Sequence, residues 1–274
     1  MAPLVGSGLW FGSGGNNGRG IFALGNTTTT NIYTYSSNGV VTGTNLTATL
    51  YKGSAAGNST LGIFALGNTT ATNIYTYSSN GVTTGTSLTA TLYAGAATGN
   101  STLGIFAFGN TALATNVYTY SSNGVTTGTN LTGGLNGGAA TGNSTLGIFA
   151  LGGTATNIYT YSSNGAATGT SLAGSLGSGA AAGNSTLGIF ALGNTSTTTN
   201  IYTYSSNGVT TGTSLTADSA WGSAAGNSTL GIFALGNTTA TNIYTYSSNG
   251  VTTGTNLTAI LYLGAAASST PGGF

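Results

Sequence analysis

Charged side chains are almost absent from this sequence. Its 274 residues include two basic groups, Arg19 and Lys52, one acidic group, Asp218, and neither histidine nor cysteine. General acid–base catalysis uses His, Asp, Glu, Lys, Tyr or Cys held near the working pH, and a hydroxyl nucleophile needs an adjacent base. No part of the chain gathers such groups, so we predict that the protein is not an enzyme.

The same shortage argues against several kinds of binding site. Zinc and calcium sites need clusters of Cys, His or carboxylate ligands, and phosphate backbones are bound mainly through Lys and Arg. No apolar run approaches the roughly 18 residues of a membrane-spanning helix. We therefore expect no metal site, no cofactor, no nucleic-acid partner and no membrane insertion. The first residues carry no basic region followed by an apolar run, so no signal peptide is predicted either.

A surface with so few charges favours association, because charged side chains normally keep proteins dispersed. Two interpretations stay open. Thr, Ser and Asn could hydrate a monomer, or the chain could be a subunit of a homo-oligomer or larger assembly whose partners cover its surface.

The sequence is built from six near-copies of one unit of about 42 residues. The first unit reads GIFALGNTTTTNIYTYSSNGVVTGTNLTATLYKGSAAGNSTL, and the six units begin at Gly20, Gly62, Gly104, Gly147, Gly188 and Gly231. A period of this length is typical of a four-stranded propeller blade. We predict an all-β fold, a six-bladed β-propeller in which residues 1–274 form a single domain.

Each unit contains four short segments suited to strands, separated by Gly, Asn and Ser clusters. In the second unit these are Gly62–Leu66, Asn73–Tyr77, Val82–Leu88 and Leu92–Thr98. The last segment is rich in small residues, as expected for the strand nearest a crowded propeller axis. The SSNG run between the second and third segments predicts a hairpin, because Asn and Gly accept positive φ. A helical interpretation fails because Gly, Thr, Asn and Ser fill every window.

The fourth unit resembles a kelch repeat. Its GIFALGG segment, Gly147 to Gly153, resembles the apolar strand and double glycine of that pattern, and Tyr159 and Tyr161 resemble the aromatic strand that follows. Uncharged β repeats rich in Gly, Thr and Asn are also similar to those of some bacterial surface proteins and bacteriophage virion or tail proteins. These resemblances imply binding or assembly. In the other five units the second glycine is asparagine: Asn26, Asn68, Asn110, Asn194 and Asn237.

The flanks, residues 1–19 and 262–274, bear on ring closure. Leu9–Gly15 and Leu261–Ala267 both resemble the Leu50–Ala56 segment of the first unit. A six-bladed ring needs one such strand to complete its shared blade, so the other is surplus or pairs with another subunit. We favour a closed ring, because closure protects the strand edges. An open solenoid that stacks into a fibre is the alternative.

Two functional hypotheses follow. The first is a non-enzymatic structural or adhesive repeat protein, a virion, tail or extracellular surface component that presents repeated loops to a partner or surface receptor. The alternative is a multivalent propeller lectin that binds glycans at repeated interblade sites. Its candidate ligand-binding residues are the asparagines of the GNST loops, Asn58, Asn100, Asn143, Asn184 and Asn227.

Structural roles compete with glycan binding at the repeated residues. The asparagines also suit turns, because an Asn side chain satisfies nearby backbone groups. The tyrosines of the YTY segments also suit a core between blades. Trp221 breaks the repeat symmetry near Asp218, and we align it with Tyr51 and Tyr93 of earlier units.

Overall fold

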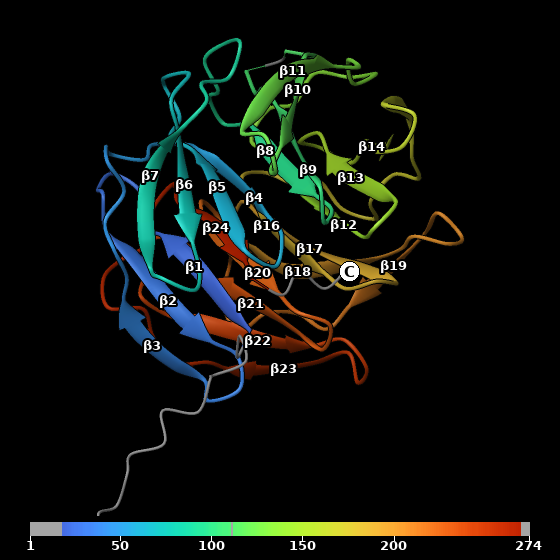
Figure 1. Cartoon of the computed structure of the whole chain (residues 1–274). Coiled ribbons are helices and arrows are strands. Elements are labelled where there is room, and N and C mark those ends of the chain that lie inside the picture. The colour runs from blue at the N-terminus through green and yellow to red at the C-terminus, as the bar shows by residue number, and fades with distance from the viewer. Residues whose placement is uncertain (1–17, 111, 270–274) are drawn as a thin grey trace, which may run out of the picture.

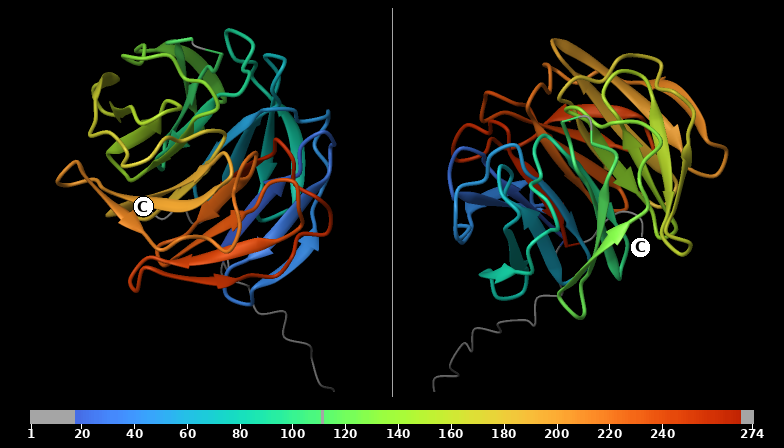
Figure 2. Two further views of the ribbon diagram at one scale, coloured as in Figure 1. Left: turned by 180° about the vertical axis from the view of Figure 1, so that it is seen from behind. Right: turned by 90° about the horizontal axis from the view of Figure 1, so that it is seen from above.

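The computed structural model describes residues 18–110 and 112–269, and within that part the chain forms strands and loops but no helix. Its 24 strands make six antiparallel four-stranded sheets. The sheets are arranged as blades around a common centre (Figure 1), and the other two views in Figure 2 show the same ring. The predicted six-bladed β-propeller is confirmed.

Every blade has the same order from the centre outward: a strand of small residues, the GIFA strand, the tyrosine strand and a threonine-rich outer strand. The blades are β24 (Ala265–Ser268), β1 (Arg19–Ala23), β2 (Thr30–Thr34), β3 (Gly39–Thr42); β4 (Ser54–Gly57), β5 (Leu61–Ala65), β6 (Thr72–Thr76), β7 (Gly81–Gly85); β8 (Ala96–Gly99), β9 (Leu103–Ala107), β10 (Thr115–Thr119), β11 (Gly124–Gly128); β12 (Ala139–Gly142), β13 (Leu146–Ala150), β14 (Thr156–Thr160), β15 (Gly165–Thr168); β16 (Ala180–Gly183), β17 (Leu187–Gly193), β18 (Ser196–Thr203), β19 (Gly208–Gly212); β20 (Ser223–Gly226), β21 (Leu230–Ala234), β22 (Thr241–Thr245), β23 (Gly250–Thr253).

The structure corrects the assignment of four strands from one repeat to one blade. The fourth strand of each repeat does not pair within that repeat: β8, from the second unit, pairs with β9 of the third unit. The small-residue strand is therefore innermost, as predicted, but it belongs to the blade that follows. The strand is also shorter than expected, Ala96–Gly99 instead of Leu92–Thr98, and the outer strand is Gly81–Gly85 instead of Val82–Leu88.

The ring is closed by pairing a strand near the C-terminal end of the chain with the first strand. β24 pairs with β1, with Ile21 opposite Ala267 and Ala23 opposite Ala265. The two strands lie side by side in Figure 1, at the blue and red ends of the colour bar. The similar segment Leu9–Gly15 lies outside the described residues.

Apolar side chains fill the spaces between blades. In each GIFA strand, Ile and Phe point to opposite faces, so Ile63 packs toward the next blade while Phe64 packs toward the preceding one. Each of the six interfaces joins the Ile of one blade to the Phe and the tyrosine pair of the next. Burying one such Phe stabilises the fold by about 1.5–3 kcal/mol. Because these side chains meet between neighbouring blades, the core lies there and not within any one blade.

The predicted SSNG hairpins have the expected backbone. Their six asparagines adopt φ between 50° and 54°, as Asn80 does before Gly81. Asn80 also accepts a hydrogen bond from the Tyr75 hydroxyl, and its Oδ1 lies 3.2 Å from the Thr44 backbone nitrogen of the preceding blade. The left-handed region also explains the asparagines that replace the second glycine of GIFALGG. Asn68 has a φ of 50°, close to the 73° of Gly153, and Asn tolerates this region better than most residues.

A second set of asparagines, at the start of each tyrosine strand, holds neighbouring blades together. Asn73 is fully buried, its Oδ1 lies 2.8 Å from the Thr47 backbone nitrogen, and its Nδ2 donates to the Thr47 hydroxyl at 2.8 Å. The same link joins Asn31 to Thr258 across the point where the ring closes. Each bond crosses from one blade to the next, so closure of the ring satisfies these buried amides.

Candidate functional site

The innermost strands surround an uncharged central channel. All six line cavities of about 90 and 100 Å³ along the axis, and the residues there are almost entirely Gly and Ala, with a few Ser and Thr. Within the described residues no group of His, Cys, Asp or Glu could hold a metal ion, and no helix could cross a membrane. The polar side chains in the channel wall are the hydroxyls of these Ser and Thr residues.

At one end, six equivalent residues form a circle just before the innermost strands. They share a left-handed backbone, with φ from 51° to 63°, and each precedes a glycine: Lys52, Ala94, Gly137, Ser178, Trp221 and Leu263. Backbone hydrogen bonds run around this circle, for example from the Trp221 nitrogen to the Ser178 oxygen at 2.8 Å and from the Lys52 nitrogen to the Leu263 oxygen at 3.1 Å. We call these six residues the mouth ring.

At four of the six positions the mouth ring is held by the blade that follows it. There the residue before the ring position donates its backbone N–H to the end of a buried GIFAL strand, as Tyr51 does to the Leu66 oxygen at 2.8 Å and Tyr262 to the Leu24 oxygen at 2.9 Å. The ring residue then turns back over the channel. A left-handed backbone at a residue other than glycine costs about 1–3 kcal/mol, and Gly137 is the one member that avoids this cost.

This geometry corrects the alignment of Trp221. Its backbone takes the place of Lys52 and Ala94, whereas Ala220 takes the place of Tyr51: the Ala220 oxygen approaches Gly236 as the Tyr51 oxygen approaches Gly67. The sequence prediction was therefore wrong by one residue. Aligned in this way, the six repeats place six different amino acids at one position, although the glycine after it is the same in all.

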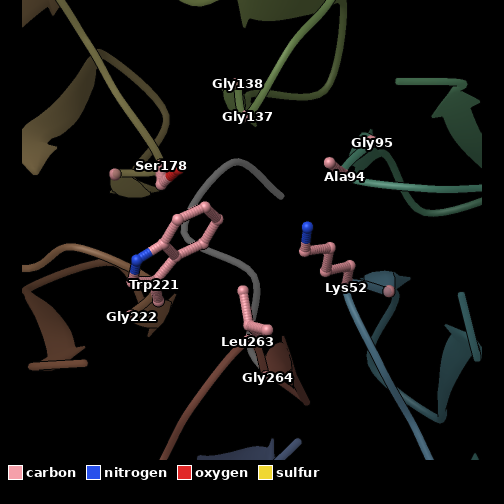
Figure 3. A pocket seen from close by; sticks show the side chains of 12 residues that line it. Lys52, Ala94, Gly95, Gly137, Gly138, Ser178, Trp221, Gly222, Leu263 and Gly264 are labelled. Carbon is pink, nitrogen blue, oxygen red and sulfur yellow. The ribbon is translucent and has the colours of Figure 1, made fainter. Parts of the chain in front are cut away.

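Lys52 is the centre of a group of aromatic rings at the mouth. Its Nζ donates to the Tyr93 hydroxyl at 2.6 Å and lies 4.4 Å from the centre of the Tyr93 ring. The centres of the Trp221 and Tyr51 rings are 5.5 and 5.6 Å from the same nitrogen, within the range of cation–π attraction. Figure 3 shows Lys52, Trp221 and Leu263 projecting over the same opening.

The electrostatics of the mouth are those of a single cation. The hydrogen bond to Tyr93 raises the pKa of Lys52, so the ammonium is charged at neutral pH. The chain's one acidic residue, Asp218, accepts a hydrogen bond from the Ala220 nitrogen at 3.2 Å, and no carboxylate of the described residues pairs with Lys52. A cavity of about 60 Å³ lies beside it, lined by the mouth ring and the glycines that follow.

The five candidate asparagines lie at the opposite end of the channel, where the innermost strands end. The side-chain oxygen of each accepts hydrogen bonds from the two backbone nitrogens that lie two and three residues ahead, and from the nearby Thr hydroxyl. In the case of Asn100 these lie at 2.9 Å from Thr102 and Leu103, and at 3.0 Å from the Thr102 hydroxyl. In four of the five, Nδ2 also donates to a serine oxygen of the next blade at 3.0–3.4 Å.

The structure thus places these asparagines as turn residues and blade connectors, in equivalent positions that do not meet at one point. One of them, Asn184, also borders a cavity of about 270 Å³ between two blades, together with Thr186, Leu187, Ser228, Thr229, Tyr246 and Ser247. All twelve tyrosines of the YTY segments are buried, and burial raises the pKa of each.

The mouth ring was not predicted from the sequence. The signal was present, because aligning the repeats on the glycine before each small-residue strand exposes a column of six different residues. The alignment does not show that those residues are neighbours in space, because they are about forty positions apart in the chain and come together only in the closed ring.

Comparisons with known proteins agree with the fold and leave the family open. No family model matches the sequence, and no curated protein matches it, so the kelch resemblance stays a prediction. Among solved structures, the chain is similar to one described as the structure of YjhT, with a TM-score of 0.67 and 9% sequence identity over 81% of this chain and 88% of that chain. At this identity the likeness shows the propeller fold alone.

Proposed function

We propose that this chain is a non-enzymatic structural or adhesive repeat protein, a virion, tail or extracellular surface component that presents its repeated blade edges to a partner. The observation that supports this most directly is the outer strand of each blade. β7, for example, reads GVTTG, and its two threonines are exposed. These six outer strands, which we call the rim strands, contain no charged residue and no proline.

Proteins usually protect an exposed strand edge with charges, prolines or a covering element, because unpaired backbone groups on an edge pair readily with another chain. The rim strands carry β-branched and small side chains instead, and Val41 on β3 is 58% exposed. The three charged groups of the chain lie elsewhere: Arg19 beside the Tyr77 oxygen, Lys52 at the mouth and Asp218 in a loop. Low charge and open edges together favour a homo-oligomer or larger assembly.

The experiment is to measure assembly of the full chain and of a variant with charged rims. Sedimentation velocity over a wide concentration range should show association of the wild-type protein. Thr83→Lys, Thr126→Lys and Thr210→Lys together place one charge on the rim strand of each of three blades, β7, β11 and β19. This variant should remain monomeric with an unchanged circular dichroism spectrum. Serine at the same three positions is the matched control and should associate as the wild-type protein does.

A monodisperse wild-type monomer at every concentration, with no binding to particles or cell envelopes, would contradict the proposal. Electron micrographs of the native material separate the two forms of assembly. Filaments or sheets indicate self-association through the rims, and single propellers at fixed places on a virion or envelope indicate a heterologous partner.

Glycan binding is the second candidate, and the cavity beside Asn184 favours it. Hydroxyl groups of Ser228, Thr229 and Ser247 and the ring of Tyr246 line this space, and such groups supply hydrogen bonds and an apolar face to a sugar. A glycan array tests it. A hit weakened by Ser247→Ala but not by Ser205→Ala, the equivalent residue of the preceding blade, would support this site, and an array without hits would count against it.

A further inference from the structure

We propose that the mouth of the channel at the Lys52 end is a single binding site for a small ring-bearing carboxylate. The carboxylate would bind the Lys52 ammonium, and its ring would lie against Trp221 and the neighbouring tyrosines. This site is separate from the rim strands and does not depend on the proposed assembly.

The mouth ring breaks the symmetry of the six repeats. The blades repeat their core residues almost unchanged, yet the mouth ring holds Lys, Ala, Gly, Ser, Trp and Leu at one structural position. A propeller that needed only to close would use small residues at a position with left-handed backbone, as Gly137 does. Bulky side chains kept in this unfavourable conformation cluster at functional sites. The varied side chains of the mouth ring therefore point to a function beyond closing the propeller.

The Lys52 ammonium has hydrogen-bond donors left for an anion. One of its three N–H donors is used by the Tyr93 hydroxyl, and no carboxylate of the described residues pairs with the ammonium. The aromatic rings hold the cation in place without neutralising it. An anion that reaches it gains charge-assisted hydrogen bonds beside apolar surface, where they are stronger than in open water.

The shape and lining of the mouth limit the size and chemistry of the ligand. The cavity of about 60 Å³ has room for a carboxylate but not for a whole ring, so the rest of the ligand lies across the open mouth. There it meets Trp221, whose ring is 6.5 Å from that of Tyr262, and Leu263. Ser178 is the one hydroxyl-bearing side chain in the mouth ring. Apolar surface with few hydrogen-bonding groups suits a planar, apolar ring better than a polyol (Figure 3).

The test is isothermal titration calorimetry with full-length protein and matched small molecules. Benzoate carries the carboxylate on an aromatic ring, benzyl alcohol is its neutral counterpart, glucuronate carries the same charge on a sugar ring, and glucose is the neutral sugar. We expect saturable, salt-sensitive benzoate binding at one site per chain, with benzyl alcohol weaker by about tenfold or more, the effect of losing one charge-assisted contact.

Three variants locate the site. Lys52→Met removes the charge but keeps the length of the side chain, and Trp221→Ala installs the residue that Ala94 already provides at the equivalent position. Each should weaken benzoate binding by about tenfold or more without changing the unfolding midpoint. Arg19→Met removes the chain's other cation, which lies at the far end of β1 from the mouth, and should leave binding unchanged.

Binding of glucuronate without benzoate would keep a ring-bearing carboxylate as the ligand and identify the ring as a sugar. Equal binding of the charged and neutral partners, full binding by Lys52→Met, or no saturable binding of either acid would overturn the proposal. Because the rim strands are intact in all three variants, assembly measured on the same samples shows whether the proposed function stands independently.

Discussion

The buried tyrosine hydroxyls allow one prediction to be worked out in detail, because the repeats differ in whether the hydroxyl has a partner. The Tyr204 hydroxyl lies 3.1 Å from that of Thr141 on the innermost strand of the preceding blade. The equivalent hydroxyl of Tyr120 is buried and has no hydrogen-bond partner among the described residues. Ala56 occupies in the Tyr120 interface the position that Thr141 occupies in the Tyr204 interface. The methyl carbon of Ala56 would lie 3.2 Å from a Cβ atom placed on Gly104.

Replacing each tyrosine by phenylalanine should therefore change the free energy of unfolding differently in the two interfaces. Tyr204→Phe removes a hydrogen bond and leaves the Thr141 hydroxyl buried alone, so the free energy of unfolding should fall by about 1–2 kcal/mol. Tyr120→Phe removes a buried hydroxyl whose hydrogen bond is already missing, so the free energy of unfolding should stay the same or rise by up to about 1 kcal/mol. Both substitutions keep the aromatic ring at an equivalent core position, so its packing contribution to the free energy of unfolding cancels in the comparison.

The converse experiment adds the missing partner. Ala56→Thr should place a hydroxyl beside Tyr120 and raise the free energy of unfolding by about 1 kcal/mol relative to Ala56→Val, which has the same shape without the hydroxyl. Guanidinium chloride unfolding followed by far-ultraviolet circular dichroism measures all four variants. Equal losses in the two phenylalanine variants, or equal stability of the threonine and valine variants, would refute the reasoning.

Three further predictions concern the whole ring. Burial raises the pKa of the twelve core tyrosines, while in the unfolded chain they titrate near the ordinary value of 10, so the free energy of unfolding should be constant below about pH 10 and fall above it. Twelve of the chain's fifteen tyrosines belong to this group, so most of the rise in absorbance at 295 nm should coincide with the loss of circular dichroism, and ionisation of all fifteen in a folded protein would contradict this. Asn73→Ala leaves the backbone nitrogen of Thr47 without its partner in the next blade, so it should lower the free energy of unfolding by about 1–3 kcal/mol, measured by denaturant titration. Ser37→Ala on an exposed hairpin is the control and should change this free energy little. Ending the chain at Gly264 removes β24 and exposes β1, so size-exclusion chromatography should show strand-exchanged dimers or aggregates that the full chain does not form. Ending it at Ser269 should preserve the elution profile of the full chain.

Much of the fold could be predicted from the sequence, because it depends on local and periodic signals. The repeat period determined the number of blades, the SSNG runs located the hairpins, and the small residues of segments such as Ala96–Gly99 identified the innermost strand. The pairing of that strand could not be predicted in the same way. A repeat of four strands can be divided into blades at any point, and only the closed ring decides that β8 pairs with β9 of the following unit.

The candidate site depended on tertiary structure. The sequence by itself determined that the chain has one acidic side chain, one lysine and one arginine to use in any site. It did not indicate that the lysine belongs to a site, because its partners are distant along the chain: Tyr93 is 41 residues away and Trp221 lies in a different repeat. The ring brings equivalent positions of all six repeats to one opening, so substitutions that look scattered in the sequence become neighbours around the channel.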